Sequence, residues 1–473
     1  MKKIFVVAFC VIVLFIIFSK PAIRGDSSGY IKIAKGFIGR GDTDNDLGSR
    51  SILYILLLSL YMMIFGLKNY LIWIMITQFI MLFVSTILLY KIFFKLSKNI
   101  KLASIVVFAF ILNFSTITYA QMILTETLTG FLFLVLVYFV SDMMLGNASY
   151  HRFFSVGIIT GLLVLSRFNL MLLPIWIFII IVLILFFREK KRSLKILILK
   201  MGSFLIPYII ILNLFCLYNY NNFGFYAPFP MDGNGISRNA VLNVLDDTVK
   251  VTDEYKGVKQ IFMNAKKSVI NKEKVTRKGS ILSMMSGDSY QKFRRLNSGF
   301  NIYGGSEETL FIYFNIENQK NRRFVLTKKL GPFYQQVIDQ KTSELFKLRI
   351  FSLFNSFRQA SHRLDGFYFS KRLPGFIFLG YKIVFYLFMI LFLIFAFYYI
   401  VKNFRNRHFF TDNFIFFIIL LFISYFPIIN FVYATLNDAN RFKFPSESLI
   451  FGIVIYLIYR IFFSKRKLKE YKK

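Results

Sequence analysis

Three charged residues stand at the ends of long apolar runs, where a side chain can act at a membrane surface. Asp26, in the stretch RGDSSGYIKIAKGF, closely follows the first apolar run. Glu126, in QMILTETLTG, lies between two later runs, and Arg441, in NRFKFPSESL, precedes the last one. A carboxylate can take a proton from an attacking hydroxyl, and a guanidinium can grip a phosphate through two parallel hydrogen bonds. Together they suit chemistry on a lipid-linked substrate that bears a phosphate.

Glycines flank Asp26 at Gly25 and Gly29, so the backbone there can turn tightly and approach a substrate. An apolar helix face follows, formed by Tyr30, Ile33, Ala34 and Phe37. We expect this helix to lie on the membrane surface. Two interpretations of Asp26 are open. It is a general base, or it caps the helix, a place that Ser27 or Ser28 can also take.

Glu126 also has two interpretations. It is a supporting acid that positions an acceptor or binds a metal, or it is a favourable charge at the N-terminus of a helix. An acidic cluster, formed by Asp42, Asp44 and Asp46, is expected to be a solvated turn that a divalent cation can visit. The chain contains no helical His pair and no Cys/His cluster. The cofactor is therefore unknown from the sequence, with a divalent metal ion as one option.

Further basic residues can hold the phosphate. Lys443 lies two residues after Arg441, just before Pro445 opens the last apolar run, and Arg167 lies in LSRFNLMLLP. Basic side chains at membrane boundaries also anchor to lipid headgroups. Such anchors favour the cytoplasmic side, whereas the topology described below places these residues on the outer side. We therefore expect Arg441, Lys443 and Arg167 to bind the donor phosphate.

The composition is that of a polytopic membrane protein. Hydrophobic residues make up 56% of the 473 positions, and several runs can span about 30 Å of hydrocarbon. The net charge of +35 fits short basic loops that set topology and meet anionic headgroups. Membrane lipids, and not nucleic acid, are therefore the expected partners. Cys10 and Cys216 both lie in apolar runs, which indicates neither a disulfide nor a metal site.

Clusters of basic residues predict which loops face the cytoplasm, and they lie at 91–101, 188–195, 402–408 and 465–473. With both termini inside, about ten crossings are expected, near 3–19, 70–90, 102–119, 127–143, 153–166, 169–187, 196–216, 376–401, 413–433 and 446–463. The run at 51–66 is then a re-entrant or interfacial helix on the outer face. The alternative is that it crosses and that the 91–101 loop breaks the charge rule. The outer face then holds Asp26, Glu126, Arg167 and Arg441.

The apolar runs and one long polar stretch divide this all-α membrane protein into three parts. Residues 1–216 form an N-terminal transmembrane module whose first outer loop is 20–69. Residues 217–375 contain no run of spanning length, so we expect an extracytoplasmic domain of α or α+β structure. Residues 376–473 add the last transmembrane helices and a basic cytoplasmic tail. The first apolar run also fits a signal peptide, although no clear cleavage site follows it.

Five segments, taken in order along the chain, carry a family resemblance. GDSSGYIKIAKGF resembles a first outer loop whose acid maps to Asp26, and SILYILLLSLYMMIFG resembles the segment that follows. LTETLTGFLFL resembles a second acidic motif at Glu126. GLLVLSRFNLMLLP resembles an arginine motif at Arg167, with Phe168 in place of the usual proline, and NRFKFPSESL resembles the motif before a late helix. All five are similar to the GT-C superfamily of membrane glycosyltransferases, in particular the family 39-like group of protein mannosyltransferases and the lipid A aminoarabinose transferase.

The resemblance has two further departures. YNYNNFGFYAPFP is similar to a further segment of the family, with Asn219, Phe223 and Gly224 in place but Tyr218 where arginine is usual. The lysine that is common in the first loop of the lipid A branch has no clear match. Both departures concern the contacts to the donor phosphate and the branch of the family.

The resemblance implies a glycosyltransferase in the bacterial plasma membrane, with its active site on the extracytoplasmic face. It would pass a sugar, with inversion, from a polyprenyl-phosphate donor to an extracytoplasmic glycan, lipid or protein. The residues assigned to this reaction are Asp26 as base, Glu126 as supporting acid, Arg441, Lys443 and Arg167 at the donor phosphate, and Tyr30 and Asn219 as substrate contacts.

Two other functions stay open. A polysaccharide polymerase or ligase with a diphosphate-linked donor also carries a large outer loop with basic residues, but it would not need Asp26. A flippase or transporter for lipid-linked sugars places ionisable residues near the bilayer midplane, often at broken helices. In this chain the acids and arginines lie at the ends of apolar runs.

Overall fold

The computed structural model describes residues 2–23, 26–40, 52–144, 149–188, 194–228, 238–275, 298–319, 322–355, 375–403, 414–433 and 444–463. In these ranges the chain is mostly helical, and an isolated parallel bridge joins Ala22 to Met122. The chain forms two compact units. The first contains residues 1–214, 357–426 and 441–473, and the second contains 215–356 and 427–440.

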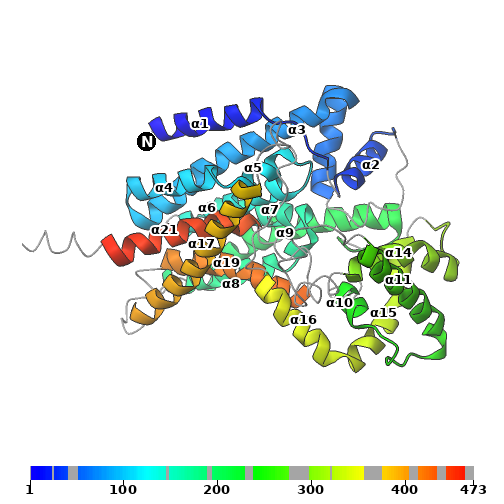
Figure 1. Ribbon diagram of the computed structural model, residues 1–473. Coiled ribbons are helices and arrows are strands. Elements are labelled where there is room, and N and C mark those ends of the chain that lie inside the picture. Colours follow the sequence, from blue (N-terminus) through cyan, green and yellow to red (C-terminus); the bar gives the residue numbers. More distant parts are fainter. Residues whose placement is uncertain are drawn as a thin grey trace, which may run out of the picture. The chain divides into compact units, whose positions relative to one another are not determined.

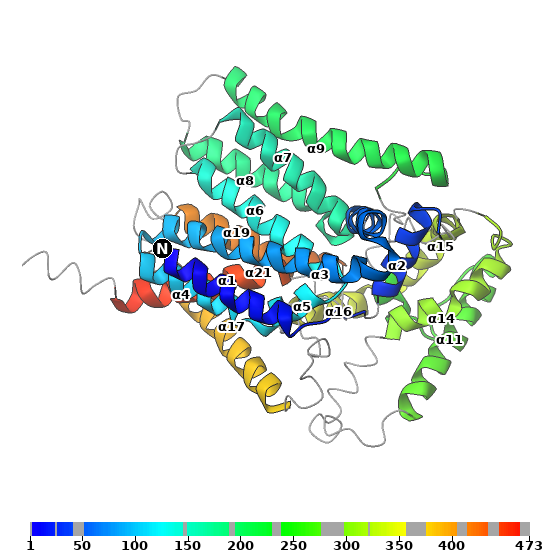
Figure 2. The ribbon, with the colours of Figure 1, turned by 90° about the horizontal axis from the view of Figure 1, so that it is seen from above.

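The first unit is a bundle of apolar helices (Figure 1). Its elements are α1 (Lys2–Ile17), α2 (Ser27–Phe37), α3 (Ile52–Ser97), α4 (Ile100–Ile111), α5 (Phe114–Gln121), α6 (Glu126–Met144), α7 (Tyr150–Ser166), α8 (Leu173–Arg188), most of α9 (Leu194–Phe223), α17 (Gly375–Asn403), most of α19 (Phe414–Tyr433) and α21 (Phe444–Ile458). Helix α3 packs against α1, α2, α4 and α6, and α6, α7 and α8 run side by side (Figure 2). Helix α3 is therefore the central element of this bundle.

Four helices in the described part of the chain are long and apolar enough to span a membrane, at Ile52–Ser97, Glu126–Met144, Lys195–Asn222 and Pro445–Phe462. Shorter apolar helices lie at Lys3–Ile17, Ile100–Ile111, Tyr150–Ser166, Leu173–Leu185, Leu387–Val401 and Phe416–Ile429. These helices agree with the predicted all-α membrane protein. The number of crossings and the assignment of faces stay predictions.

The predicted crossing at 102–119 is wrong as a single helix. Helix α4 ends at Ile111, and α5 begins at Phe114. At the break, the amide of Asn113 donates to the carbonyl of Phe110, and the hydroxyl of Thr116 donates to the carbonyl of Asn113 at 2.9 Å. Asn, Ser and Thr offer the backbone such alternatives to helical hydrogen bonds, so the run NFSTIT interrupts an otherwise apolar helix.

The runs at 51–66 and 70–90 form one element, α3, with a sharp change of direction at Gly66. Gly66 has φ 72° and ψ 166°, a backbone conformation that favours glycine. On the two sides of this kink, the hydroxyls of Tyr61 and Thr77 lie 2.5 Å apart, and the rings of Phe65 and Trp73 stack with their centroids 4.6 Å apart. The kink therefore divides α3 into two segments, as the sequence predicts, and whether the first segment crosses stays a prediction.

Helices α6 and α7 are joined by ion pairs at one end of the pair. Asp142, near the end of α6, pairs with Lys95 from the last turn of α3 and with Arg152 from the first turn of α7. The ammonium group of Lys95 also lies 4.1 Å from the ring centroid of Tyr138 on α6. Because these side chains are only partly exposed, the cluster fixes how α3, α6 and α7 meet.

The second unit is built from shorter helices around its own apolar core. After α9 come α10 (Arg238–Val244), a 3₁₀ turn η3 (Asp253–Tyr255), α11 (Lys256–Val275), α14 (Ser298–Tyr313), α15 (Arg322–Gln340) and α16 (Thr342–Asn355). Buried residues from all five α-helices meet, among them Val241, Phe262, Leu310, Phe333 and Leu348. Its described residues contain no strand, so the α alternative of the predicted domain fits them.

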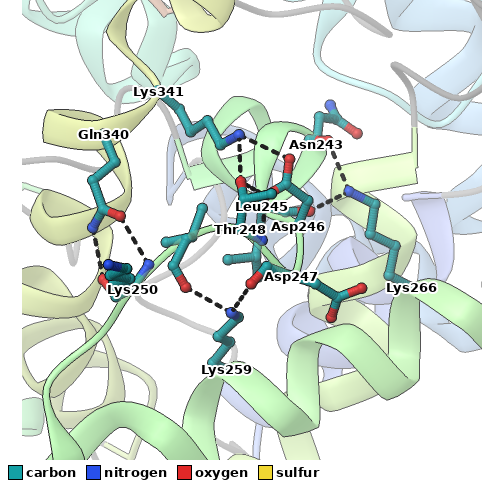
Figure 3. A network of polar contacts seen from close by, with 11 residues as sticks. Asn243, Leu245, Asp246, Asp247, Thr248, Lys250, Lys259, Lys266, Gln340 and Lys341 are labelled. Atoms are coloured by element: carbon teal, nitrogen blue, oxygen red, sulfur yellow. Dashed lines mark hydrogen bonds and ion pairs between the residues drawn. The ribbon is translucent and has the colours of Figure 1, made fainter.

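Lysines stabilise the loop that follows α10 (Figure 3). The ammonium group of Lys266 donates to the carbonyls of Asn243 and Leu245, at 2.9 and 2.5 Å. The ammonium group of Lys259, two turns earlier on α11, donates to the carbonyls of Asp247 and Val249. Lys341 pairs with Asp246 at 2.8 Å. Burial lowers the pKa of Lys266, since it disfavours the charged form.

Replacement of Lys266 by Met is expected to destabilise the second unit by about 1–3 kcal/mol, because two partly buried carbonyls lose their donor. Lys267→Met is the matched control, since the neighbouring Lys267 is exposed. Denaturant unfolding of the two purified variants measures the difference. Equal stability of the two variants would contradict the assigned role of Lys266.

Candidate active site

Glu126 and Arg167 are brought together by the antiparallel arrangement of α6 and α7. Glu126 is the first residue of α6 and is 0% exposed, and Arg167 directly follows the last residue of α7 and is 7% exposed. The Nη1 atom of Arg167 lies 3.6 Å from Oε1 of Glu126. The two sequence-predicted site residues therefore form a buried ion pair, at the end of α6 opposite to Asp142.

Burial makes an opposite charge favourable for both Glu126 and Arg167. A buried carboxylate or guanidinium is costly unless an opposite charge and hydrogen bonds compensate it. Thr125 and Thr127 next to Glu126 and Ser166 next to Arg167 are buried as well, and the hydroxyls of Thr129 and Ser166 lie 3.1 Å apart. The ends of α6 and α7 thus form a polar patch inside an apolar bundle.

The segments that precede Asp26 and Glu126 are paired with each other. The amide of Ala22 donates to the carbonyl of Gln121 at 2.9 Å, and the amide of Ile123 donates to the carbonyl of Ala22 at 3.1 Å. The side-chain amide of Gln121 also donates to the hydroxyl of Ser19 at 2.7 Å.

The bridge is parallel, so both segments leave it in the same direction. Asp26 lies four residues after Ala22, and Glu126 lies four residues after Met122. Both acids therefore follow segments that are paired with each other, and their placement at one face of the membrane stays a prediction.

Asp26 occupies the residue before α2, and its side chain makes no capping hydrogen bond. Its backbone has helical angles, φ −67° and ψ −18°, and its carbonyl accepts from the amide of Tyr30 at 3.2 Å. An N-cap side chain normally accepts a hydrogen bond from an amide two or three residues later. The capping interpretation of the carboxylate therefore has no support in the geometry, and the base interpretation stays a prediction.

Helix α2 buries the apolar face that the sequence predicts, but it buries that face against α3. Tyr30, Ile33 and Ala34 are 7%, 2% and 0% exposed. The ring of Tyr30 meets the ring of Tyr54 edge-on at 5.5 Å, and the hydroxyl of Ser59 donates to the carbonyl of Ala34 at 3.1 Å. The first segment of α3 therefore covers this face, and the position of the helix at the membrane surface stays a prediction.

The predicted phosphate ligands Arg441 and Lys443 and the acidic residues Asp42, Asp44 and Asp46 lie outside the described residues. Asn219 belongs to the second unit, where it is 1% exposed and donates to the carbonyl of Ala227 at 2.6 Å. Its amide fixes the turn after α9, where Gly224 has φ 73°.

Sequence reasoning missed Glu447, a buried acid in the first turn of α21. Glu447 is 1% exposed and lines a pocket with Asn113, Thr127, Phe131 and Ser448. The available signal was an acid inside the last apolar run, although an acid after a proline also suits an ordinary helix start. In the described part of the chain no three His, Cys, Asp or Glu side chains are grouped as metal ligands.

We expect Arg167→Met to destabilise the protein by about 3–5 kcal/mol, because it leaves the buried Glu126 carboxylate without this cation. Glu126→Gln combined with Arg167→Met should recover much of that loss, since neither charge remains. Unfolding in detergent measures both variants. Lys256→Met is the control, because its ion pair with Asp253 is exposed and should contribute little. Equal losses for the single and the double variant would show that the two charges are not coupled.

Comparison with known proteins gives one likeness. No protein-family model and no curated protein match the chain. Two solved structures are similar to it, both of ArnT from Cupriavidus metallidurans, one in the apo state and one bound to undecaprenyl phosphate. They are each 11% identical to the chain, with TM-scores of 0.34 and 0.33, over 96% of this chain and 76% and 77% of theirs. A likeness of this degree assigns no activity, and the function is inferred from the chain's own residues.

Proposed function

We propose that this protein is a membrane glycosyltransferase that moves a sugar from a polyprenyl-phosphate donor to an extracytoplasmic acceptor. The acceptor class is a glycan, a lipid or a protein, and the reaction takes place at the outer face of a bacterial plasma membrane. The proposal rests on the motifs of the sequence and on one observation in the structure. The segment that carries Asp26 is hydrogen-bonded to the segment that carries Glu126, and Glu126 pairs with Arg167.

The chemistry follows from what each group can do. The leaving group of a polyprenyl-phosphate sugar is already a phosphodiester, so it needs positive charge and no protonating acid. The acceptor hydroxyl needs one base, which we assign to Asp26. Direct displacement at the anomeric carbon inverts its configuration.

The phosphate is assigned to the basic residues. Arg167 is held beside Glu126 at the end of α7, and the sequence adds Arg441 and Lys443. Guanidinium groups suit phosphate because their planar donors match two phosphate oxygens. In this assignment Glu126 orients Arg167 and helps to position the acceptor.

The position of the buried charges favours an enzyme over a transporter. Glu126 is the first residue of α6, and Arg167 directly follows α7, so both lie at helix ends. Transporters place their ionisable residues near the middle of the membrane, at broken helices. A polymerase or ligase with a diphosphate donor would not need the acid at Asp26.

The test is sugar transfer by the purified full chain in liposomes, offered a panel of polyprenyl-phosphate sugars with a membrane extract as acceptor. Asp26→Asn and Asp26→Ser are the informative variants, because Asn and Ser cap helices well but are not bases. If Asp26 is the base, both variants lose transfer by about 10²- to 10⁴-fold. If Asp26 only caps α2, both retain it.

Two outcomes would contradict the proposal. Transfer from diphosphate-linked donors alone would indicate the polymerase or ligase. Absence of transfer from every donor, together with movement of the labelled lipid between leaflets, would indicate the flippase.

A further inference from the structure

Gln78 is a buried amide in the middle of the apolar helix α3. It is 1% exposed, and its neighbours in the sequence, ITQFIM, are mostly apolar. A buried amide is costly unless its donors and acceptor are used. All are used here: Nε2 donates to the carbonyls of Ala120 and Met122 at 3.0 and 2.9 Å, and Oε1 accepts from the hydroxyl of Tyr54 at 3.3 Å.

The two hydrogen bonds of Nε2 act on the segment that leads to Glu126. The last carbonyls of a helix have no partner within that helix, and α5 ends at Gln121. Gln78 binds the carbonyls of Ala120 and Met122, whereas Ala22 binds the carbonyl of Gln121 and the amide of Ile123. The segment is therefore held from two sides, by Gln78 on one and by Ala22 on the other.

The side-chain oxygen of Gln78 is connected through Tyr54 to helix α2, which follows Asp26. Tyr54 is 0% exposed, and its hydroxyl is held by Gln78. The ring centroids of Tyr54 and Tyr30 lie 5.5 Å apart. Tyr30 lies in the first turn of α2, four residues after Asp26. One amide thus connects the segment before Glu126 with the helix after Asp26.

We propose that Gln78 is a positioning residue that fixes the separation of the Asp26 and Glu126 carboxylates. This role rests on the proposed function, in which both acids face one substrate. Gln78 touches neither acid. It acts through the backbone of residues 120–122 and through the pair of Tyr54 and Tyr30.

The experiment compares Gln78→Leu with Thr86→Val, a matched control two turns further along α3. Thr86 is also 0% exposed, but its hydroxyl donates only to the carbonyl of Phe83 in its own helix. Both changes remove a buried polar group, and only the first removes a connection between elements. Each is made in the full chain, with Cys10 and Cys216 replaced by Ser.

The first readout needs no activity. Ala22→Cys with Met122→Cys places two thiols at the bridge, where the backbones of paired strands lie about 4.8 Å apart, within the Cα–Cα range of disulfides. Mild oxidation should close this disulfide in the chain with Gln78 and in the Thr86→Val variant. Its yield should fall several-fold with Gln78→Leu, because the segment of residues 120–123 loses one of its two supports.

The second readout is transfer. With the thiols reduced, Gln78→Leu should lower kcat by about tenfold to a hundredfold, with a smaller effect on the KM for the donor, because the misplaced base Asp26 takes no part in phosphate binding. In the fraction that forms the disulfide, kcat should rise again, since the covalent link replaces the lost support. Thr86→Val should change neither value.

An unchanged disulfide yield in Gln78→Leu would overturn the proposal. So would a loss of kcat that the disulfide fails to restore, which indicates a general loss of folding. If Gln78→Leu does not fold, Gln78→Asn takes its place, because its shorter amide reaches one carbonyl at most. If no variant and no unmodified chain transfers sugar, the proposed function fails, and the disulfide yield still decides the role of Gln78.

Discussion

Residues 122–125, between α5 and α6, form a stretch of non-helical main chain that is buried inside a helical membrane protein. Buried N–H and C=O groups that leave a helix must find other partners, since neither lipid nor packed side chains supply them. Here the partners come from three places: the backbone of Ala22, the side-chain amide of Gln78, and Ser19 for the side chain of Gln121. The hydrogen bonds made by this stretch and by Gln121 hold α3 and α5 close to the chain that follows α1. They also pair the segment that leads to Asp26 with the segment that leads to Glu126.

Ion pairs connect helices of the same bundle at both ends of α6. Glu126 at its start pairs with Arg167, and Asp142 near its end pairs with Lys95 and Arg152. A membrane helix gains little from apolar contact with another, because lipid is equally apolar. Polar and ionic contacts therefore set how α6 and α7 align along their length, which places the end of α7 against Glu126.

The sequence predicts much of this because its signals are local. Apolar runs locate the helices, the i, i+3, i+4 spacing locates the buried face of α2, and acids at run ends locate Asp26 and Glu126. The bridge at Ala22, the amide of Gln78 and the burial of Glu447 were not predicted, because each depends on residues far apart in the chain. The break between α4 and α5 was missed since hydropathy averages over NFSTIT, whereas hydrogen bonds of Asn113 and Thr116 decide the backbone there.

The bridge between Ala22 and Met122 also has a consequence for how the protein is made. A chain emerges from the ribosome N-terminal end first, and Ala22 must wait for a partner that is 100 residues away in the sequence. Until α3, α4 and α5 have been inserted, the segment before Asp26 lacks its partner segment at Met122. The two segments can thus pair only late in biogenesis, so a half-made protein in the membrane carries Asp26 without the pairing that precedes it in the complete chain.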